Sequence, residues 1–146
     1  MVVVKDLMNS EVCSIDRRSS AFEAASMMTK KGVSCLIVTS GENTKQAEGI
    51  VTRRDVFEKV VVKRKDIDSV LVEEIMHAPV ITVLSTASLV AASGIMKARR
   101  IKQLPVVEAD EDGSVIGIIT QTDIVANMNA ILKFNIAHSY QEKPNV

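Results

Sequence analysis

The chain repeats itself once, and this duplication constrains its fold more than any other feature. A shift of 68 positions aligns the two halves without a gap. The shift superposes Met8 on Met76, Val12 on Val80, Ser14 on Thr82, Ala24 on Ala92, Met28 on Met96, Leu36 on Leu104 and Val38 on Val106. Two copies predict a pair of like units related by a pseudo-twofold axis, not an open solenoid. We place the first unit with a charged connector at residues 1–68, and the second unit with a C-terminal helix and tail at residues 69–146.

Each copy carries the same motif, at residues 49–55 and 117–123: glycine, two branched apolar residues, threonine, two variable residues and aspartate. The pattern predicts a strand that runs directly into a helix. At such a junction the free N–H groups and the threonine hydroxyl can bind phosphate, and the aspartate can accept hydrogen bonds from two sugar hydroxyls. The motif therefore favours a nucleotide site. The same residues also form a capping box, in which the threonine and the aspartate only cap the helix, and the sequence leaves both readings open.

Each unit is predicted to contain a helical turn, a strand, an amphipathic helix, two strands and a closing helix. We expect helical turns at 4–8 and 72–76, first strands at 12–15 and 80–83, and second strands at 35–39 and 104–107. The first amphipathic helix is capped by Ser19 or Ser20 and has Ala21, Ala24, Ala25 and Met28 on one face, and its counterpart spans 87–99. Segments 40–46 and 108–114 are predicted to be exposed hairpin tips, and 63–68 a solvated connector. The closing helices span 52–61 and 120 to about 138, the latter with Ile131, Leu132, Phe134 and Ile136 as apolar positions, before a polar tail at 141–146 that we expect to fray.

Composition excludes several classes of function. The 146 residues are 47% hydrophobic, which is enough for a core, and 18 basic residues balance 18 acidic ones. A net charge of zero and 3% aromatic residues argue against a nucleic-acid partner and against attraction to a membrane surface. Cys13 and Cys35 lie in apolar runs without metal-ligand spacing, so we expect reduced core residues. The sequence shows neither a signal peptide nor a membrane-spanning run, and we expect a soluble, cytoplasmic protein.

The order of elements, the gapless duplication, both motifs and the segments at 76–82 and 104–106 resemble a tandem pair of CBS (cystathionine-β-synthase) domains, over about residues 2–128. The resemblance implies an α+β fold in which two β-α-β-β-α units pack sheet to sheet with pseudo-twofold symmetry. It also implies homodimers, and clefts between the units that bind an adenosine-containing ligand such as AMP, ADP, ATP or S-adenosylmethionine.

The resemblance also implies which residues bind the ligand. Asp123 and Asp55 would accept hydrogen bonds from the ribose, and Thr120 and Thr52 would donate to phosphate. The base would be bordered by Thr82 and Ser14 with Val80, Val83, Val12 and Ile15 on one side, and by Pro105 and Val106 against Ile37 and Val38 on the other. The first unit departs from the family pattern, with Glu11 in place of Pro79 and Ile37 in place of Pro105. We therefore expect the Thr120/Asp123 site to be the stronger one, and Glu11 to repel a polyphosphate if it faces a cleft.

Several basic residues are candidate phosphate partners, although solvated helix ends also carry such residues. They are Arg53 and Arg54 beside the first motif, and Arg99, Arg100 and Lys102 before the strand at 104–107. His77 and His138 have no partners at metal-ligand spacing, and we expect no role for them.

The sequence favours a regulatory sensor module that needs no cofactor, binds an adenine nucleotide as its regulatory ligand and transmits occupancy to a regulated partner protein. No nucleophile with a base, no functional carboxylate pair and no metal cluster is visible, so we do not expect an enzyme. The alternative is an interaction protein with empty clefts that acts through its dimer surface and C-terminal helix. Binding of nucleic acid or of magnesium is disfavoured by the zero net charge and the absence of a carboxylate cluster.

Overall fold

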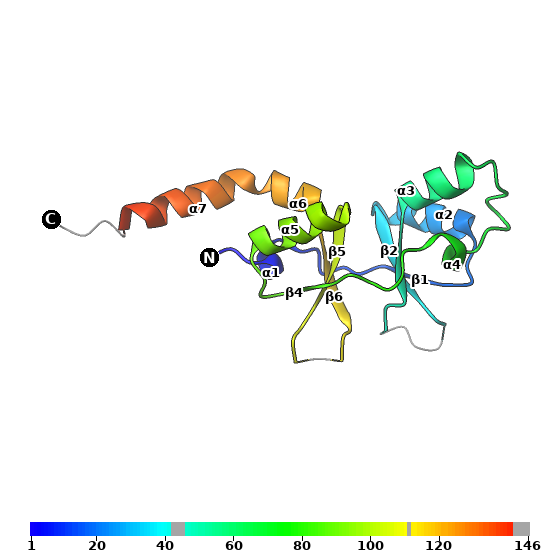
Figure 1. Ribbon diagram of the computed structural model, residues 1–146, viewed down its shortest axis with the longest axis horizontal. Coiled ribbons are helices and arrows are strands. Elements are labelled where there is room, and N and C mark those ends of the chain that lie inside the picture. The colour runs from blue at the N-terminus through cyan, green and yellow to red at the C-terminus, as the bar shows by residue number, and fades with distance from the viewer. Residues whose placement is uncertain (42–45, 111, 142–146) are drawn as a thin grey trace.

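Two three-stranded sheets, each covered by helices, form the core of the molecule (Figure 1). The computed structural model describes residues 1–41, 46–110 and 112–141. The first repeat contains α1 (Val4–Leu7), β1 (Ser14–Asp16), α2 (Ala21–Lys31), β2 (Cys35–Thr39), β3 (Gly49–Thr52), α3 (Arg53–Val56) and the π-helical turn η1 (Phe57–Val61). The second contains α4 (Val72–Ile75), β4 (Val83–Leu84), α5 (Leu89–Arg99), β5 (Gln103–Val107), β6 (Val115–Thr120), α6 (Gln121–Ala126) and α7 (Met128–Gln141).

The two sheets have the same topology and register. β1 is parallel and β3 antiparallel to β2, with Leu36 opposite Val51. β4 and β6 flank β5 in the same way, with Leu104 opposite Ile119. A shift of 68 positions maps one pair onto the other. The predicted α+β units are therefore confirmed.

Helix α2 shows how the sequence sets these elements. The Ser20 hydroxyl accepts a hydrogen bond from the Glu23 N–H, and the Glu23 carboxylate accepts one from the Ser20 N–H, which completes a capping box. Gly32 ends the helix in the left-handed region, at φ 65°. Ala24 and Met28 lie on its buried face, as their spacing predicts, and their small and flexible side chains let the helix approach the sheet closely.

The opening helix of each repeat packs on the other repeat. Val4 of α1 is fully buried with Leu104 and Ile119 of the second sheet, while Val72 of α4 is fully buried with Leu36 of the first. Backbone hydrogen bonds fix both helices, from the Val4 N–H to the Ala87 carbonyl at 2.9 Å and from the Val72 N–H to the Ser19 carbonyl at 2.8 Å. Each hydrophobic core thus contains residues from both sides of the predicted boundary between residues 68 and 69. That boundary describes the repeats in the sequence and stays a prediction for the domains.

Backbone pairs between the repeats show the pseudo-twofold axis directly. Asn9 pairs with Ile118 through hydrogen bonds of 2.8 and 2.9 Å, and His77 pairs with Ile50 through hydrogen bonds of 3.0 and 2.9 Å. The shift of 68 positions interchanges the two pairs. Between them the sheets pack on each other through an apolar cluster built on Cys35, Ile37 and Ile118, with Val12, Ala47, Ile50 and Val115 around it. The predicted packing of sheet on sheet is confirmed.

Two elements begin later than predicted. The strands expected at 12–15 and 80–83 start at Ser14 and Val83. The residues before them cross from one repeat to the other and, at Asn9 and His77, pair with the third strand of the opposite sheet. Hydrophobicity alone does not distinguish such a crossing segment from a strand.

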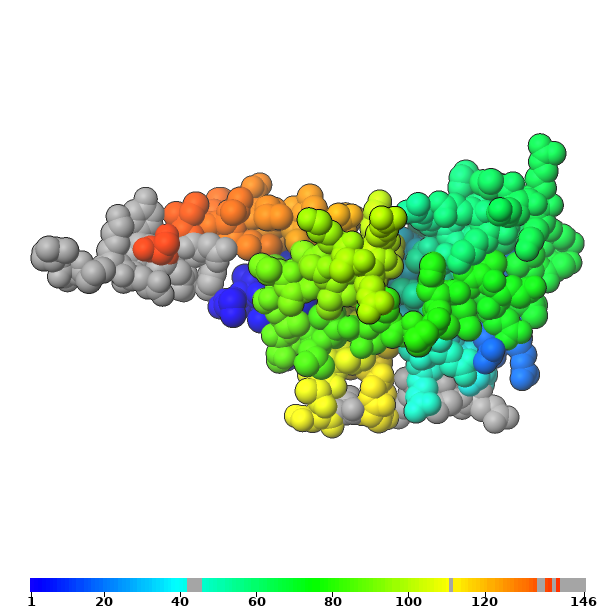
Figure 2. All heavy atoms as spheres, viewed as in Figure 1, coloured from blue at the N-terminus to red at the C-terminus, as the bar shows by residue number. Residues whose placement is uncertain are grey.

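The long closing helix predicted for the second repeat is broken at Asn127, where φ is −100° and ψ is 5°. The Asn127 side chain donates to the Asp123 carbonyl at 2.7 Å, which competes with the helical hydrogen bonds. Helix α7 then leaves the second unit as an arm (Figure 2). Ile131 packs on the second core, whereas Leu132 and Ile136 are exposed; the side chains of Phe134 and His138 lie outside the described residues.

The remaining predictions concern the first closing helix and the loops. Residues 53–61 are helical as predicted, and the Val62 N–H bonds the Phe57 carbonyl at 2.9 Å, the spacing of a π-turn. The described residues at the hairpin tips, such as Gly41 and Asp112, are exposed, while 42–45, 111 and the tail at 142–146 lie outside the described residues. Within the described ranges, no helix combines the length and the apolar composition needed to cross a membrane.

Candidate functional site

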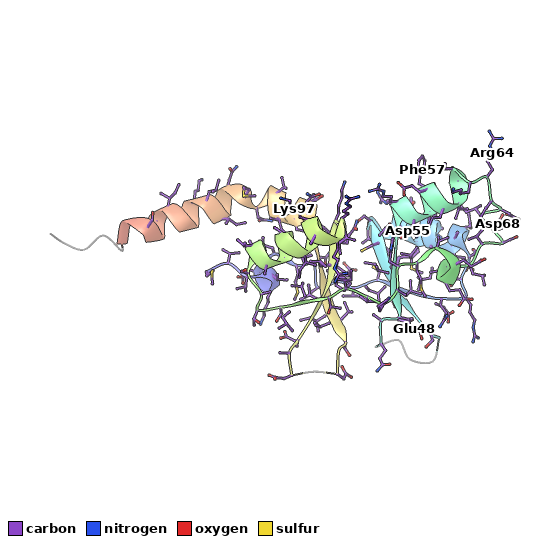
Figure 3. The ribbon with its side chains drawn as sticks, in the orientation of Figure 1. Glu48, Asp55, Phe57, Arg64, Asp68 and Lys97 are labelled. Carbon is purple, nitrogen blue, oxygen red and sulfur yellow. The ribbon has the colours of Figure 1, made fainter. Side chains whose placement is uncertain are left out.

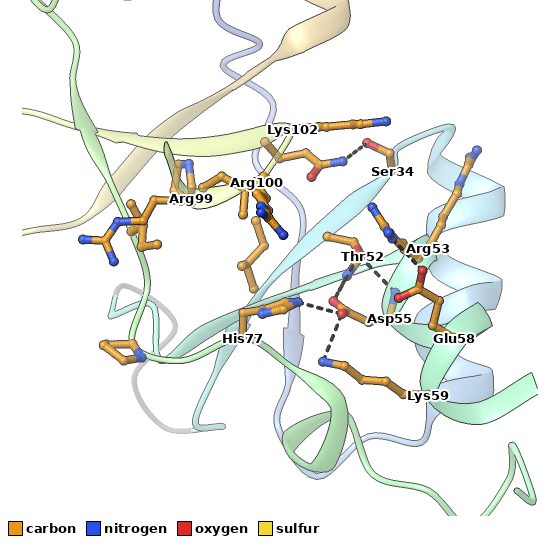
Figure 4. A pocket seen from close by; sticks show the side chains of 17 residues that line it. Ser34, Thr52, Arg53, Asp55, Glu58, Lys59, His77, Arg99, Arg100 and Lys102 are labelled. Atoms are coloured by element: carbon orange, nitrogen blue, oxygen red, sulfur yellow. Dashed lines mark hydrogen bonds and ion pairs between the residues drawn. The ribbon is translucent and has the colours of Figure 1, made fainter. Parts of the chain in front are cut away.

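A cavity of about 680 Å³ lies between the two units (Figure 4). The first unit contributes its motif, from Thr52 to Asp55. The second contributes Pro79, Ile81 and the residues where α5 meets β5, from Arg99 to Gln103 with Pro105. An apolar lining of isoleucine and proline side chains thus adjoins a strongly charged one.

The cavity combines the motif of one repeat with the apolar segments of the other. The cause is the backbone pair between Ile50 and His77, which brings the segment leading to β4 alongside β3. Pro79 and Pro105 therefore face Thr52 and Asp55, not the motif of their own repeat. Our reason for preferring the Thr120/Asp123 site, that both prolines lie in the second repeat, does not hold. The pseudo-symmetry places Glu11, the counterpart of Pro79, on the side of Thr120.

Asp55 is the most constrained charged group of the cavity, and its side chain is 4% exposed. One carboxylate oxygen, Oδ2, accepts from the Thr52 N–H at 2.9 Å and from the Thr52 hydroxyl at 3.0 Å. The other, Oδ1, lies 2.8 Å from His77 Nε2 and 3.2 Å from Lys59 Nζ. Both oxygens are thus engaged within the protein. Asp55 thus forms the expected capping box with Thr52 and has two further partners, His77 and Lys59.

His77, for which we expected no role, is therefore a partner of Asp55. The two residues are 22 positions apart, and only the crossing segment brings them together. Lys59 could have been found from the sequence, since an acid and a base at positions i and i+4 of a helix commonly pair.

Asp123 occupies the equivalent position in the second repeat, but its carboxylate is less engaged. Its Oδ2 accepts from the Thr120 N–H at 2.9 Å, and its own N–H donates to the Thr120 hydroxyl at 3.1 Å. Among the described residues, no hydrogen bond or ion pair reaches its Oδ1. The positions of His77 and Lys59 are held here by Asn9 and Asn127, whose side chains bond backbone groups. The two motifs differ in whether a carboxylate oxygen is available to a ligand.

Positive charge dominates the cavity, although the chain is neutral overall. Arg54 pairs with Glu58 at 2.7 Å, and this hydrogen bond raises the pKa of the guanidinium above its ordinary value. The other cations that line the cavity without an acidic partner among the described residues are Arg53, Arg99, Arg100 and Lys102. A cavity with four unpaired cations attracts anions.

The sequence-predicted site residues divide into two groups. Thr52, Arg53, Arg54, Asp55, Arg99, Arg100, Lys102 and Pro105 line the cavity. The others lie elsewhere: Val83 and Val106 in the second core, Ile37 and Val12 in the cluster between the sheets, Ser14 and Thr82 exposed, Val80, Thr120 and Asp123 half-buried. The lining residues that sequence reasoning missed, besides His77 and Lys59, are Ser34, Ile50, Glu58, Pro79, Ile81, Ile101 and Gln103.

Other sites of chemistry are limited. In the part of the chain that the structure describes, no three His, Cys, Asp or Glu side chains are placed to hold a metal ion. Cys13 and Cys35 are free thiols, as predicted. Burial raises the pKa of the Cys35 thiol to about 11, which keeps it protonated and unreactive near neutral pH.

Comparisons with known proteins agree with this architecture. The CBS domain family model matches residues 4–62 and 72–130. The uncharacterized protein MK0525 of Methanopyrus kandleri is 32% identical over 124 residues, which are 85% of this chain and 61% of that protein. A homoserine O-acetyltransferase of Methanocorpusculum labreanum is 36% identical over 119 residues, 82% of this chain but only 23% of that enzyme. The chain thus spans less than two thirds of the length of these curated relatives.

Among solved structures, the CBS domain protein PAE2072 of Pyrobaculum aerophilum, complexed with AMP, superposes with a TM-score of 0.80 at 23% identity. The match covers 92% of this chain and 99% of that one, and at this identity it shows a shared fold. With the family model matching both repeats, the chain belongs to the CBS domain family and carries two CBS domains.

Proposed function

We propose that this chain is a regulatory module that binds an adenosine-containing nucleotide in the cavity between its two CBS domains. The observation that carries the proposal is the cavity itself, which joins an apolar lining of Ile50, Ile81 and Pro105 to unpaired cations. The first can hold a flat base, and the second can hold phosphate. The Pyrobaculum protein of the same fold was solved with AMP, which belongs to this class of ligand.

Both domains line the cavity, so a bound nucleotide contacts both. It stabilises the arrangement of the domains that it fits best, by the difference in its affinity for the two arrangements. We propose that a regulated partner protein, still to be identified, senses this shift. The module itself signals and does not catalyse, and we place it in the cytoplasm.

The two motifs are proposed to contribute differently. Asp123 lies outside this cavity, and at the equivalent position of the second repeat its Oδ1 can accept a hydrogen bond from a ribose hydroxyl, with Thr120 beside it for phosphate. Asp55 can accept one only by giving up part of its contact with His77 or Lys59. Thr82, Ser14, Val80, Val83, Val106, Val12 and Ile37 do not line this cavity, and we do not assign them a contact with a base bound there.

A second candidate function is favoured by exposed apolar side chains. Phe57, Val61 and Val62 at the end of the first closing helix are 52–62% exposed, as are Val125 and Ile136 on α6 and α7. Phe57 and Val125 are counterparts under the shift of 68 positions, and Phe57 lies on the outer side of its helix (Figure 3). We propose that these helices form a homodimer. An interaction protein that acts through this surface alone would need no ligand.

Thermal melting distinguishes the two functions. Protein stripped of nucleotide is melted with AMP, ADP, ATP or S-adenosylmethionine; a ligand at about 100 times its Kd adds about 2.7 kcal/mol, a shift of several degrees. The matched variants Asp55→Ala and Asp123→Ala then show which motif the ligand uses. No shift with any of the four ligands, together with persistent self-association, would refute the sensor and leave the interaction protein.

A further inference from the structure

Helix α5 ends in a backbone conformation that does not suit its residue. Arg100 has φ 54° and ψ 42°, in the left-handed region, where a Cβ atom crowds the backbone. The first repeat has Gly32 at this position, with φ 65° and ψ 32°. Both residues cap their helix in the same way, through an N–H that donates to carbonyls of the last turn. The second repeat thus carries an arginine where glycine fits better, and such strain tends to persist where a side chain has a function.

Arg100 lines the cavity and points from the second unit toward the side of Asp55 (Figure 4). Lys102 lines the same cavity from the second unit, and Arg53 does so from the first. None of the three has an acidic partner among the described residues. The two carboxylates of the lining, Asp55 and Glu58, are already paired, with Lys59 and His77 and with Arg54. The positive charge of the cavity is therefore uncompensated.

A comparison of the repeats separates this charge from an ordinary helix end. Arg99 has Lys31 as its counterpart, so a basic residue in the last turn is common to both helices and suits the helix dipole. Arg100, Lys102 and Arg53 have uncharged counterparts in Gly32, Ser34 and Gln121. A basic residue at the end of both helices does not explain Arg100, Lys102 and Arg53, and all three line one cavity. The symmetry-related side of the molecule has neutral residues in their place.

We infer that this cavity selects nucleotides by the length of their phosphate chain, binding the triphosphate more tightly than the diphosphate and the diphosphate more tightly than the monophosphate. Arg53, Arg100 and Lys102 determine this selectivity, because each added phosphate brings negative charge to uncompensated cations. The inference rests on the proposed nucleotide site. All three side chains are exposed, so the selectivity weakens as salt screens the charges.

Isothermal titration of the full chain with ATP, ADP, AMP and inorganic tripolyphosphate tests the inference. We expect ATP to bind about tenfold more tightly than AMP at low salt, a factor that corresponds to about 1.4 kcal/mol. Arg100→Gly should remove most of this advantage, because it weakens the binding of ATP more than the binding of AMP. The same titrations are repeated with the Asp123→Ala variant. If its ratio of ATP affinity to AMP affinity equals that of the wild type, the selectivity belongs to the cavity on the Asp55 side.

Arg100→Gly should also raise the melting temperature without ligand by about 2–4 °C, because glycine relieves the backbone. The matched control is Arg64→Gly: Arg64 has φ 55° and lies at the end of the first unit away from the cavity (Figure 3). This control should be stabilised in the same way and keep the full preference for ATP. A structural role of Arg100 alone would move the melting temperature but not the ratio of affinities.

The outcomes separate this inference from the proposed function. Equal affinities for ATP and AMP, or wild-type selectivity in Arg100→Gly, would overturn the inference while nucleotide binding stands. Tripolyphosphate that binds as tightly as ATP would support the selectivity for phosphate but refute recognition of adenosine. No binding of any of the four compounds would refute both.

Discussion

The two motif aspartates offer an internal comparison, since Asp55→Ala and Asp123→Ala remove the same residue from two copies of one structure. Each loses a capping box, which costs about 1 kcal/mol. Asp55→Ala also loses the contacts with His77 at 2.8 Å and Lys59 at 3.2 Å. Hydrogen bonds to charged groups are worth about 1.5–3 kcal/mol when buried. The side chains of these two partners are 58% and 39% exposed, so solvent reduces each contact to about 0.5–1 kcal/mol.

We therefore expect Asp55→Ala to lose about 2–3 kcal/mol of unfolding free energy and Asp123→Ala about 1 kcal/mol. For a chain of this size the difference of 1–2 kcal/mol corresponds to a gap of about 3–8 °C between the two melting temperatures. Urea unfolding of both variants without nucleotide gives the free energies directly. The substitution His77→Ala should destabilise the Asp55→Ala variant less than it destabilises the wild type.

Equal stabilities of the two alanine variants would show that His77 and Lys59 contribute nothing through Asp55. An additive effect of His77→Ala in the Asp55→Ala background would lead to the same conclusion.

Two further predictions concern the packing of the sheets. Gly49→Ala should cost about 1–3 kcal/mol of unfolding free energy, because its Cβ would lie 2.9 Å from the His77 carbonyl oxygen of the crossing segment. The control is Gly94→Ala, in a helix with no atom within 4 Å of the new methyl group, which should stabilise the protein by about 0.5–1 kcal/mol in thermal or urea unfolding. Similar effects of the two substitutions would contradict the close approach at Gly49. Burial raises the pKa of Cys35 from 9.0 to about 11, so its unfolded form releases a proton first and the free energy of unfolding should fall by up to about 3 kcal/mol as the pH rises through this window. Urea unfolding across the window should show a shallower fall for Cys35→Ala than for the wild type, and parallel curves would refute a buried, protonated thiol.

The duplication in the sequence predicts much of the fold, because residues that recur at a fixed offset must occupy like environments. The buried face of α2 and the capped junction at Thr52 follow from local patterns, whereas the packing of the sheets was expected from the resemblance to CBS domains. The pairing of Ile50 with His77 does not follow from local patterns, because backbone hydrogen bonds between distant segments leave no periodicity in the residues that make them. The composition of the cavity depends on this pairing.

For the same reason the sequence does not show that Pro79 and Pro105 line a cavity with Thr52 and Asp55, or that His77 contacts Asp55. The break at Asn127 was also missed. At this point the Asn127 side chain donates to the Asp123 carbonyl, and although asparagine favours caps and turns, one asparagine within an apolar pattern does not by itself predict an interruption. The charge of the cavity was visible in the sequence as separate residues, and only the fold shows that they converge.

The exchange of opening helices ties the folding of the two repeats together. Each core takes a helix from the other half of the chain, and the Val4 N–H bonds the carbonyl of Ala87, 83 positions away. The first core is complete once the chain reaches Ile75, but the second closes only when α1 packs on it from the far end of the chain, so the closure of a long loop slows its folding. A chain cut between the repeats would yield two fragments that each lack a buried helix and fit together only as a pair. We therefore expect the two domains to unfold in one cooperative transition.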